Sequence, residues 1–160
     1  MKREARQVHS RDRRARAALP IHHVGVDLWR AAIAWREGFA AEMVRRGHAW
    51  YGDARGAIAM HLDPAGLPQG ELVARMRLSK QAVQQLLDGL AADGIVDRRA
   101  DDGDRRAKWV YYTDKGLAAQ REAAKVKRRM EARLLARVGA ERLEVMRECL
   151  RAAADVFGAR

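Results

Sequence analysis

Cysteine, proline and aromatic residues are scarce in this sequence of 160 residues, which has one cysteine, three prolines and 6% Phe, Trp and Tyr. A lone thiol excludes a disulfide within the chain and any zinc or iron–sulfur site built from several cysteines, and it fits a reducing compartment. No apolar run reaches the roughly 18 residues that a membrane span needs. The charged N-terminus also lacks the apolar segment of a secretion signal. We therefore expect a cytoplasmic protein that contacts no membrane.

Acidic residues are in the minority. Asp and Glu number 21 against 32 Lys and Arg, which gives a net charge of +11 and a sequence pI of about 10.7. The length is that of one domain, and 48% hydrophobic residues are enough for one core. A strongly basic single domain makes a polyanionic partner the first hypothesis.

The positive charge is concentrated at the two ends of the chain. Residues 1–20 contain seven basic and two acidic residues, a net charge of +5, and residues 113–160 contain twelve and seven, again +5. Residues 1–20 have too few large aliphatic side chains to fold alone, so we predict a disordered basic arm. Two interpretations of the arm remain open: contact with DNA phosphates or a minor groove, or a solubilising tail. We expect residues 21–160 to form a single domain.

Apolar residues at helical spacing predict a helix over 21–45 and two more within 113–158. The first helix is apolar over more than half of its circumference, and the last has two parallel apolar stripes, one starting at Leu143 and one at Val145. We expect one stripe to pack within the chain and the other to contact a second copy. The predicted dimer contacts are Val24, Leu28, Leu143, Met146, Leu150 and Phe157.

Residues 52–112 have the pattern of a small DNA-binding lobe. A short helix is expected over about 53–62, followed by helices over 69–76 and 79–93 with only two residues between them. Strands near 95–99 and 108–113 flank a polar turn and form a two-stranded wing. The predicted fold is therefore mainly α (α+β): a winged helix-turn-helix lobe with dimerisation helices at 21–45 and 113–158.

The second helix of this motif has the side chains of a recognition helix. An α-helix fits the major groove, where glutamine can bond to adenine and lysine to guanine or phosphate. Ser79 is expected to cap the helix, and Gly94 to end it. Five polar residues are expected to face DNA: Ser79, Lys80, Gln81, Gln84 and Gln85. The alternative interpretation is an ordinary solvated helix face.

The wing is predicted to contact DNA through arginine. Arg105 is expected to enter a minor groove, with Arg98 and Arg106 as further contacts. Asp104 is expected to pair with Arg106 and stiffen the tip. The alternative is a solvated hairpin with no role in binding.

Residues 70–116, GELVARMRLSKQAVQQLLDGLAADGIVDRRADDGDRRAKWVYYTDKG, resemble the core of the MarR family of transcriptional regulators. Asp104-Arg105-Arg106 matches the D-R-R of that family's wing motif D-P-x-D-R-R, which a hydrophobic strand, L-T and a glycine follow. Asp102 replaces the usual proline, Tyr112 the usual leucine, and Gln85 a position that is often basic. These departures affect the expected operator sequence and leave the fold unchanged.

The resemblance implies a homodimeric repressor that reads a near-palindromic operator on double-stranded DNA. It also implies release from DNA when a small, often aromatic, effector binds between the dimer helices and the DNA-binding lobes. Candidate side chains for such a pocket are Trp35, Phe39, Trp50 and His61. The alternative is that they belong to the core.

Two other functions are alternatives to that of a specific regulator. A nonspecific architectural protein would use the basic arm and helices on any duplex. An enzyme would need Cys149 or a histidine, but no phosphate-binding loop, nucleophile motif or metal-ligand spacing is present. We therefore expect no catalysis, no cofactor and no metal, with Cys149 a buried structural thiol rather than a peroxide sensor.

Overall fold

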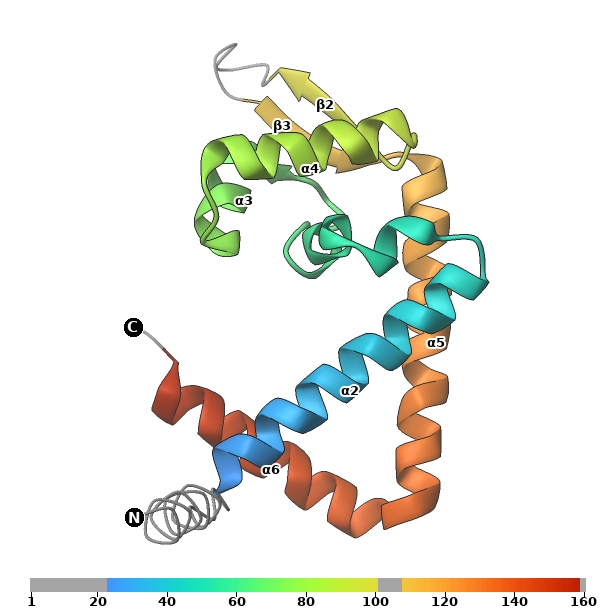
Figure 1. Ribbon diagram of the computed structural model, residues 1–160, viewed down its shortest axis with the longest axis vertical. Helices are drawn as coiled ribbons and strands as arrows, with labels where there is room; N and C mark the ends of the chain where they lie inside the picture. The colour runs from blue at the N-terminus through green and yellow to red at the C-terminus, as the bar shows by residue number, and fades with distance from the viewer. Residues whose placement is uncertain (1–22, 101–107, 159–160) are drawn as a thin grey trace, which may run out of the picture. The chain divides into compact units, whose positions relative to one another are not determined.

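The computed structural model describes residues 23–100 and 108–158 (Figure 1). The predicted arm and three predicted wing residues, Asp104, Arg105 and Arg106, lie outside the described residues. The chain divides into two units, residues up to Glu37 and residues from Gly38 onward.

The described chain is mainly helical, as predicted (Figure 1). Helix α2 spans Val24–Arg45, α3 Gln69–Met76, α4 Lys80–Ala92, α5 Asp114–Val138 and α6 Ala140–Phe157. Strands β1 (Leu67–Pro68), β2 (Val96–Ala100) and β3 (Lys108–Tyr112) complete the fold. The helix predicted over 53–62 is instead two short 3₁₀ helices, η1 (Ala49–Gly52) and η2 (Ala54–Met60).

Local capping explains where α4 begins and ends and where α5 begins. The Ser79 side chain accepts from Ala82 N at 3.1 Å and caps α4, and Thr113 caps α5 by accepting from Gly116 N at 3.1 Å. Gly94, with φ +68°, ends α4. Ile95 N then donates to Leu90 O at 2.8 Å and Gly94 N to Ala91 O at 2.9 Å, the two bonds of a Schellman motif. The predicted ends of the recognition helix are confirmed.

The sheet has three strands rather than the two predicted. The strand order is β1-β3-β2 and both pairings are antiparallel, with Leu67 opposite Val110 and Arg98 opposite Val110 on its other side. The prediction missed β1 because it has only two residues, one of them a proline, which has no backbone N–H to donate to a sheet. A proline fits here because β1 is an edge strand.

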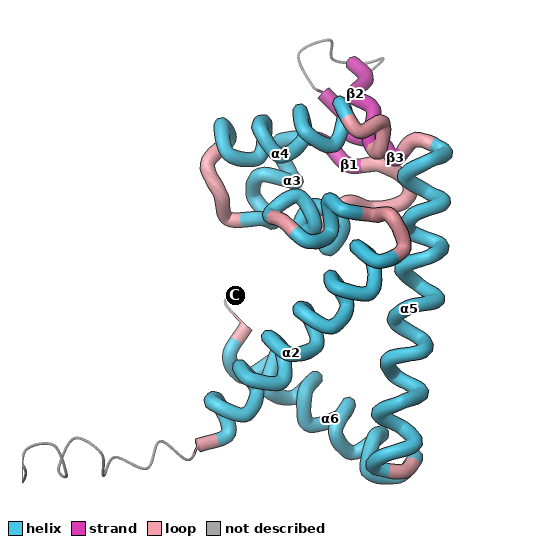
Figure 2. The backbone as a smooth tube through the Cα atoms, turned by 45° about the vertical axis from the view of Figure 1, so that its right-hand side comes forward, coloured by secondary structure: helices cyan, strands magenta, loops and turns pink. Residues whose placement is uncertain are grey.

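One core joins the lobe to α5 in the second unit. Its largest fully buried side chains include Leu72 of α3, Leu87 of α4 and Val110 of β3. Helix α5 adds Ala119, Ala123 and Val126 to the same core. Figure 2 shows α3, α4 and the sheet side by side at the start of α5.

Helix α6 buries fewer of its apolar residues within the chain than predicted. Leu143 is only 5% exposed and packs within the chain, so it is not available as a surface contact in the single chain. Beyond it neither stripe is covered: Val145, Met146, Leu150, Val156 and Phe157 are all exposed. Cys149 is exposed too, so the predicted buried thiol is wrong for the single chain. Sequence periodicity identified the apolar faces but not which of them its own chain would cover.

The described part of the first unit is the beginning of α2. Val24 and Trp29 are largely exposed there, whereas Leu28 is half-buried. Across 23–100 and 108–158, no helix combines the length and the apolar character needed to cross a bilayer.

Candidate nucleic-acid interface

Helix α4 exposes four of the five predicted recognition residues and partly covers the fifth, Gln84. Val83, Leu87 and Leu90 are fully buried. Ser79, Lys80, Gln81 and Gln85 are exposed, and Gln84 is half-buried. No acidic residue lies in the first turn, so the partial positive charge of the helix N-terminus is not neutralised there. The N-terminal end of α4 can therefore accommodate a phosphate, and side chains one turn further along the helix can reach base edges.

The turn before α4 contains a residue that the sequence did not single out. Arg77 has a left-handed backbone, with φ +52° and ψ +33°, at the end of α3. Such a conformation is unfavourable for a residue other than glycine. The exposed Arg77 side chain adds a positive charge beside the N-terminus of α4. An arginine where a helix C-terminus usually has glycine was the signal that could have found it.

A chain of hydrogen bonds ties the recognition helix to α3 and to the wing. Gln69 Nε2 donates to Gln84 Oε1 at 2.7 Å, and Gln84 Nε2 donates to Asp88 Oδ1 at 2.9 Å. Arg98 of β2 donates to the same Asp88 oxygen and forms an ion pair with it. Gln69 is itself buried, so the first member of the chain is fixed by the core.

The polarity of this chain sets the orientation of the Gln84 amide. An ionised carboxylate only accepts, so Gln84 must donate to Asp88 through its nitrogen and turn its oxygen toward Gln69. The hydrogen bond from Arg98 lowers the pKa of Asp88 below its ordinary value and favours the ionised form. Gln84 thus reaches the surface with one amide hydrogen and one oxygen lone pair already engaged.

Arg98 is placed differently from the prediction of a free DNA contact. Its side chain is only 20% exposed and its guanidinium is paired with Asp88. The sequence could not show this, because the two residues are ten positions apart and meet only when β2 packs against α4. Arg99, the next residue, is exposed, pairs with Asp97 at 3.1 Å and lies 5.4 Å from the Tyr111 ring centroid.

The other end of α4 is fixed by Arg55 of η2. Its guanidinium pairs with Asp53 at 2.7 Å and with Asp93 at 2.6 Å. A Cβ at Gly89 would lie 3.0 Å from Arg55 Cδ, so the glycine leaves room for the arginine to cross the helix. The Thr113 hydroxyl adds a hydrogen bond to Gly94 O at 2.6 Å. The recognition helix is therefore attached to η2 and α5 as well as to the wing.

The aromatic residues predicted to line an effector pocket do not share one environment. Trp50 is 3% exposed and stacks on Tyr51, with ring centroids 3.8 Å apart. Phe39 meets the same tyrosine edge-on at 5.3 Å. These contacts make Trp50 a core residue. His61 is half-buried and Trp35, in the first unit, is exposed.

A helix, a short turn, a capped recognition helix and a β-hairpin wing together define the winged helix-turn-helix class. Within 23–100 and 108–158, no group of three or more His, Cys, Asp or Glu side chains could coordinate a metal. The exposed face at the start of α4 is polar and contains one lysine, Lys80, and no acidic residue in its first turn.

Comparison with known proteins identifies the particular fold. The model of the MarR family matches residues 54–107, so the resemblance found in residues 70–116 is confirmed. No curated protein matches the sequence.

Solved structures share this fold across most of the chain. The transcriptional repressor CouR, bound to a 23-mer DNA duplex, is 24% identical with a TM-score of 0.64, over 82% of this chain and 92% of CouR. A mutant of MepR from a multidrug-resistant S. aureus clinical isolate is 20% identical with a TM-score of 0.62, over 85% and 99%. Wild-type apo MarR from E. coli is 19% identical with a TM-score of 0.62, over 83% and 98%. The chain thus has the MarR winged-helix fold.

Proposed function

We propose that this protein is a sequence-specific DNA-binding transcriptional regulator, acting as a ligand-responsive homodimeric repressor at a near-palindromic operator. The observation that carries the proposal is the exposed N-terminal half of α4. It combines a capped helix end free of acidic residues with exposed Lys80, Gln81 and Gln85. The likeness to CouR, which was solved on a DNA duplex, supports the same conclusion.

The exposed side chains have distinct roles in this proposal. Lys80 and the helix N-terminus contact phosphate or guanine, and Gln81 and Gln85 bond to base edges in the major groove. Gln84 contributes through the atoms that Gln69 and Asp88 leave free. Arg105 and Arg106 extend the contact to a minor groove, with Asp104 stiffening the tip, while Arg98 orients α4 from the base of the wing.

The exposed apolar residues support a homodimer. Met146, Leu150 and Phe157 of α6 and Val24 of α2 are exposed large side chains in the single chain. Several large apolar side chains left exposed are typical of an interaction site. A two-fold axis would separate the two recognition helices by about one turn of DNA, roughly 34 Å.

A nonspecific architectural protein is the second candidate. The observation in its favour is the charge distribution: +5 in residues 1–20 and +5 in residues 113–160, outside the lobe that would read sequence. We propose neither an enzyme nor a cofactor or metal for this chain. The exposed Cys149 is a single thiol without a metal-binding cluster among the described residues.

Fluorescence anisotropy on duplex DNA separates the two candidates. The full chain is titrated, at about 150 mM salt, with the DNA upstream of its own gene and with a random duplex of equal length. A regulator prefers the first duplex, and deleting residues 1–20 weakens binding to both without removing that preference. Equal affinity for both duplexes would overturn the proposal.

Substituting one base-reading residue refines the test. If Gln81 bonds to a base, Gln81→Ala costs roughly 1–3 kcal/mol at one operator position and little elsewhere. A uniform loss across all sequences would assign Gln81 to the DNA backbone instead.

A further inference from the structure

The turn between α3 and α4 contains a residue in an unfavourable backbone conformation. Arg77 ends α3 with φ +52° and ψ +33°, a left-handed conformation that brings the Cβ of any residue other than glycine too close to a backbone carbonyl. Among the residues that the structure describes, it is the only residue with positive φ that is not a glycine. The others are Gly47, Gly66, Gly94 and Gly139. The described chain thus has glycine wherever else its backbone turns this way.

Neither packing nor the helix ends account for an arginine at this position. The Arg77 side chain is exposed, so it fills no gap in the core. The C-terminus of α3 favours a positive charge, but the N-terminus of α4, which Ser79 caps two residues further on, disfavours one. A residue that keeps a costly conformation without a structural benefit is a candidate for a functional role.

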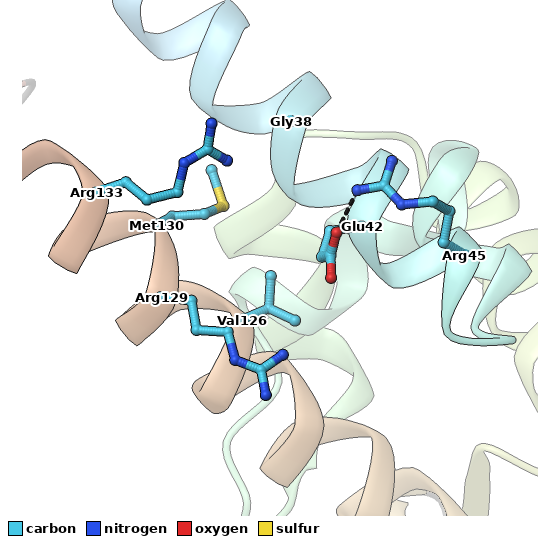
Figure 3. A pocket seen from close by; sticks show the side chains of 7 residues that line it. All are labelled: Gly38, Glu42, Arg45, Val126, Arg129, Met130 and Arg133. Carbon is cyan, nitrogen blue, oxygen red and sulfur yellow. Dashed lines mark hydrogen bonds and ion pairs between the residues drawn. The ribbon is translucent and has the colours of Figure 1, made fainter.

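Arg77 also differs from the arginines around it in having no carboxylate partner. Within α2, Arg45 and Arg46 both donate to Glu42, and Figure 3 shows the first of these pairs. From position 46 to position 99 the other arginines are paired as well: Arg55, Arg75, Arg98 and Arg99. For Arg77 the described residues provide neither an ion pair nor a side-chain hydrogen bond. Its guanidinium is therefore available to an anion from outside the chain.

This unneutralised charge lies in a stretch without acidic residues. Residues 72–87 contain three basic residues and no Asp or Glu. Glu71 neutralises one of the three, because its Oε1 lies 2.5 Å from Nη2 of Arg75. Arg77 and Lys80 remain, both exposed and on either side of the helix cap. Two unneutralised cations at the start of a recognition helix match the charge and the position of a DNA phosphate.

We propose that Arg77 contacts a phosphate of the DNA backbone and so positions α4 in the major groove. A guanidinium can bond to two phosphate oxygens at once, which fixes orientation as well as charge. Such a contact carries no base information, so Arg77 strengthens binding to every duplex equally, in contrast to Gln81 and Gln85. The assignment rests on the proposed binding of DNA by the lobe. It explains why an arginine is kept where glycine would make the fold more stable.

Three substitutions in the full chain separate the charge of Arg77 from its backbone conformation. Arg77→Gly removes both the charge and the unfavourable conformation, so Tm at a fixed protein concentration should rise by about 2–4 °C. Arg77→Gln removes only the charge and Arg77→Lys removes neither, so both should melt within about 1 °C of the wild type. If Tm did not rise in Arg77→Gly, the left-handed arginine would cost nothing and the proposal would be overturned.

Fluorescence anisotropy between about 50 and 200 mM salt measures the phosphate contact, with the upstream duplex and a random duplex of equal length as probes. On both duplexes, Arg77→Gly and Arg77→Gln should bind roughly tenfold more weakly and lower the slope of log affinity against log salt by about 0.9 per protomer. Arg77→Lys should retain the slope and bind within about threefold of the wild type. A residue needed only for the shape of the turn would give wild-type binding in Arg77→Gly, which would overturn the proposal.

Arg36→Gln is the matched control variant. It removes the same charge from an exposed arginine of α2, outside residues 52–112, that has no ion pair within the described part of the chain. Its salt slope should equal that of the wild type. An equal fall in Arg36→Gln, or an unchanged slope in Arg77→Gln, would overturn the assignment. Failure of the proposed function gives a different result: the wild type would bind both duplexes equally, while the effect of Arg77 on the slope would persist.

Discussion

Two buried tyrosines differ in how their hydroxyl groups are satisfied. Gln120 Nε2 donates to Tyr112 Oη at 2.8 Å, whereas the buried Tyr51 Oη has no hydrogen-bond partner of normal geometry among the described residues. A buried hydroxyl without a partner costs about 1–3 kcal/mol. The unpaired hydroxyl of Tyr51 therefore offsets part of the stability that the packing of its ring provides.

Removing each hydroxyl should therefore have opposite effects. We expect Tyr51→Phe to raise the free energy of unfolding by about 1 kcal/mol, because the unpaired group is lost and the ring contacts with Trp50 and Phe39 remain. Tyr112→Phe should lower it by about 1–2 kcal/mol, because the Gln120 amide loses its acceptor. Urea unfolding at neutral pH measures both, and a change of the same sign in the two variants would contradict this account.

The same tyrosine gives a pH dependence with a defined sign. Burial raises the pKa of Tyr51 from 10.0 to about 12, so the unfolded chain ionises this group before the folded chain does. Ionisation of this group therefore leaves the free energy of unfolding unchanged below about pH 10 and lowers it as the pH rises toward about 12. In Tyr51→Phe the decrease in unfolding free energy between pH 9 and pH 11 should be smaller.

At the scale of elements, the wing depends on a glycine at the start of α5. A Cβ at Gly116 would lie 2.1 Å from the carbonyl oxygen of Ile95, which is backbone and cannot rotate away. We expect Gly116→Ala to lower the free energy of unfolding by about 2–4 kcal/mol. Gly70→Ala is the control, because nothing lies within 4 Å of its added Cβ. Equal stability of the two variants in urea would disprove the steric argument.

The ion pair between Asp88 and Arg98 links the recognition helix to the wing. We expect Asp88→Asn to weaken that link and to free the Gln84 amide to turn, since an asparagine both donates and accepts. Overall operator affinity should increase slightly, because one negative charge near DNA is lost, while discrimination between operator variants falls.

Competition anisotropy with single-base operator variants measures this effect. Glu71→Gln is a suitable control, since it also removes one exposed negative charge but pairs with Arg75 outside the network. If Asp88→Asn retained full discrimination, the network would have no role in orienting Gln84.

Elements with local signals were predictable from the sequence, and elements that depend on distant partners were not. Helices α4 and α5 begin close to their predicted residues because Ser79 and Thr113 cap them locally, and α4 ends as predicted at Gly94. Strand β1 exists only through pairing with β3, some forty positions away. Arg98 was expected to contact DNA, since its ion pair with Asp88 arises only when β2 packs against α4 and leaves no local signal in the sequence.

For the whole molecule, total charge and exposed apolar surface carry different information. The net charge of +11 predicts attraction to a polyanion and steep salt dependence. It says nothing of which bases are read, since the reading surface of α4 is made of neutral glutamines and one lysine. The exposed apolar side chains of α6 instead concern dimerisation, which would bring two copies of the lobe to one operator.

Disrupting that apolar surface should separate the two copies. Leu150 is 44% exposed in the single chain, and Phe157, one heptad further along α6, is 76% exposed. A carboxylate at position 150 would have to be buried without a partner in the dimer. We expect Leu150→Glu to raise the dimer dissociation constant at least roughly 100-fold.

Sedimentation equilibrium distinguishes a species of 18.0 kDa from one of twice that mass. Glu148→Lys, on the opposite side of α6, should remain dimeric despite its larger change of charge. A monomeric Leu150→Glu should bind a single half-site with unchanged affinity but lose the advantage of the palindrome, because two linked lobes bind far more tightly than one. If Leu150→Glu stayed dimeric, α6 would not be the dimer contact, and the pairing of two recognition helices on one operator would need another surface.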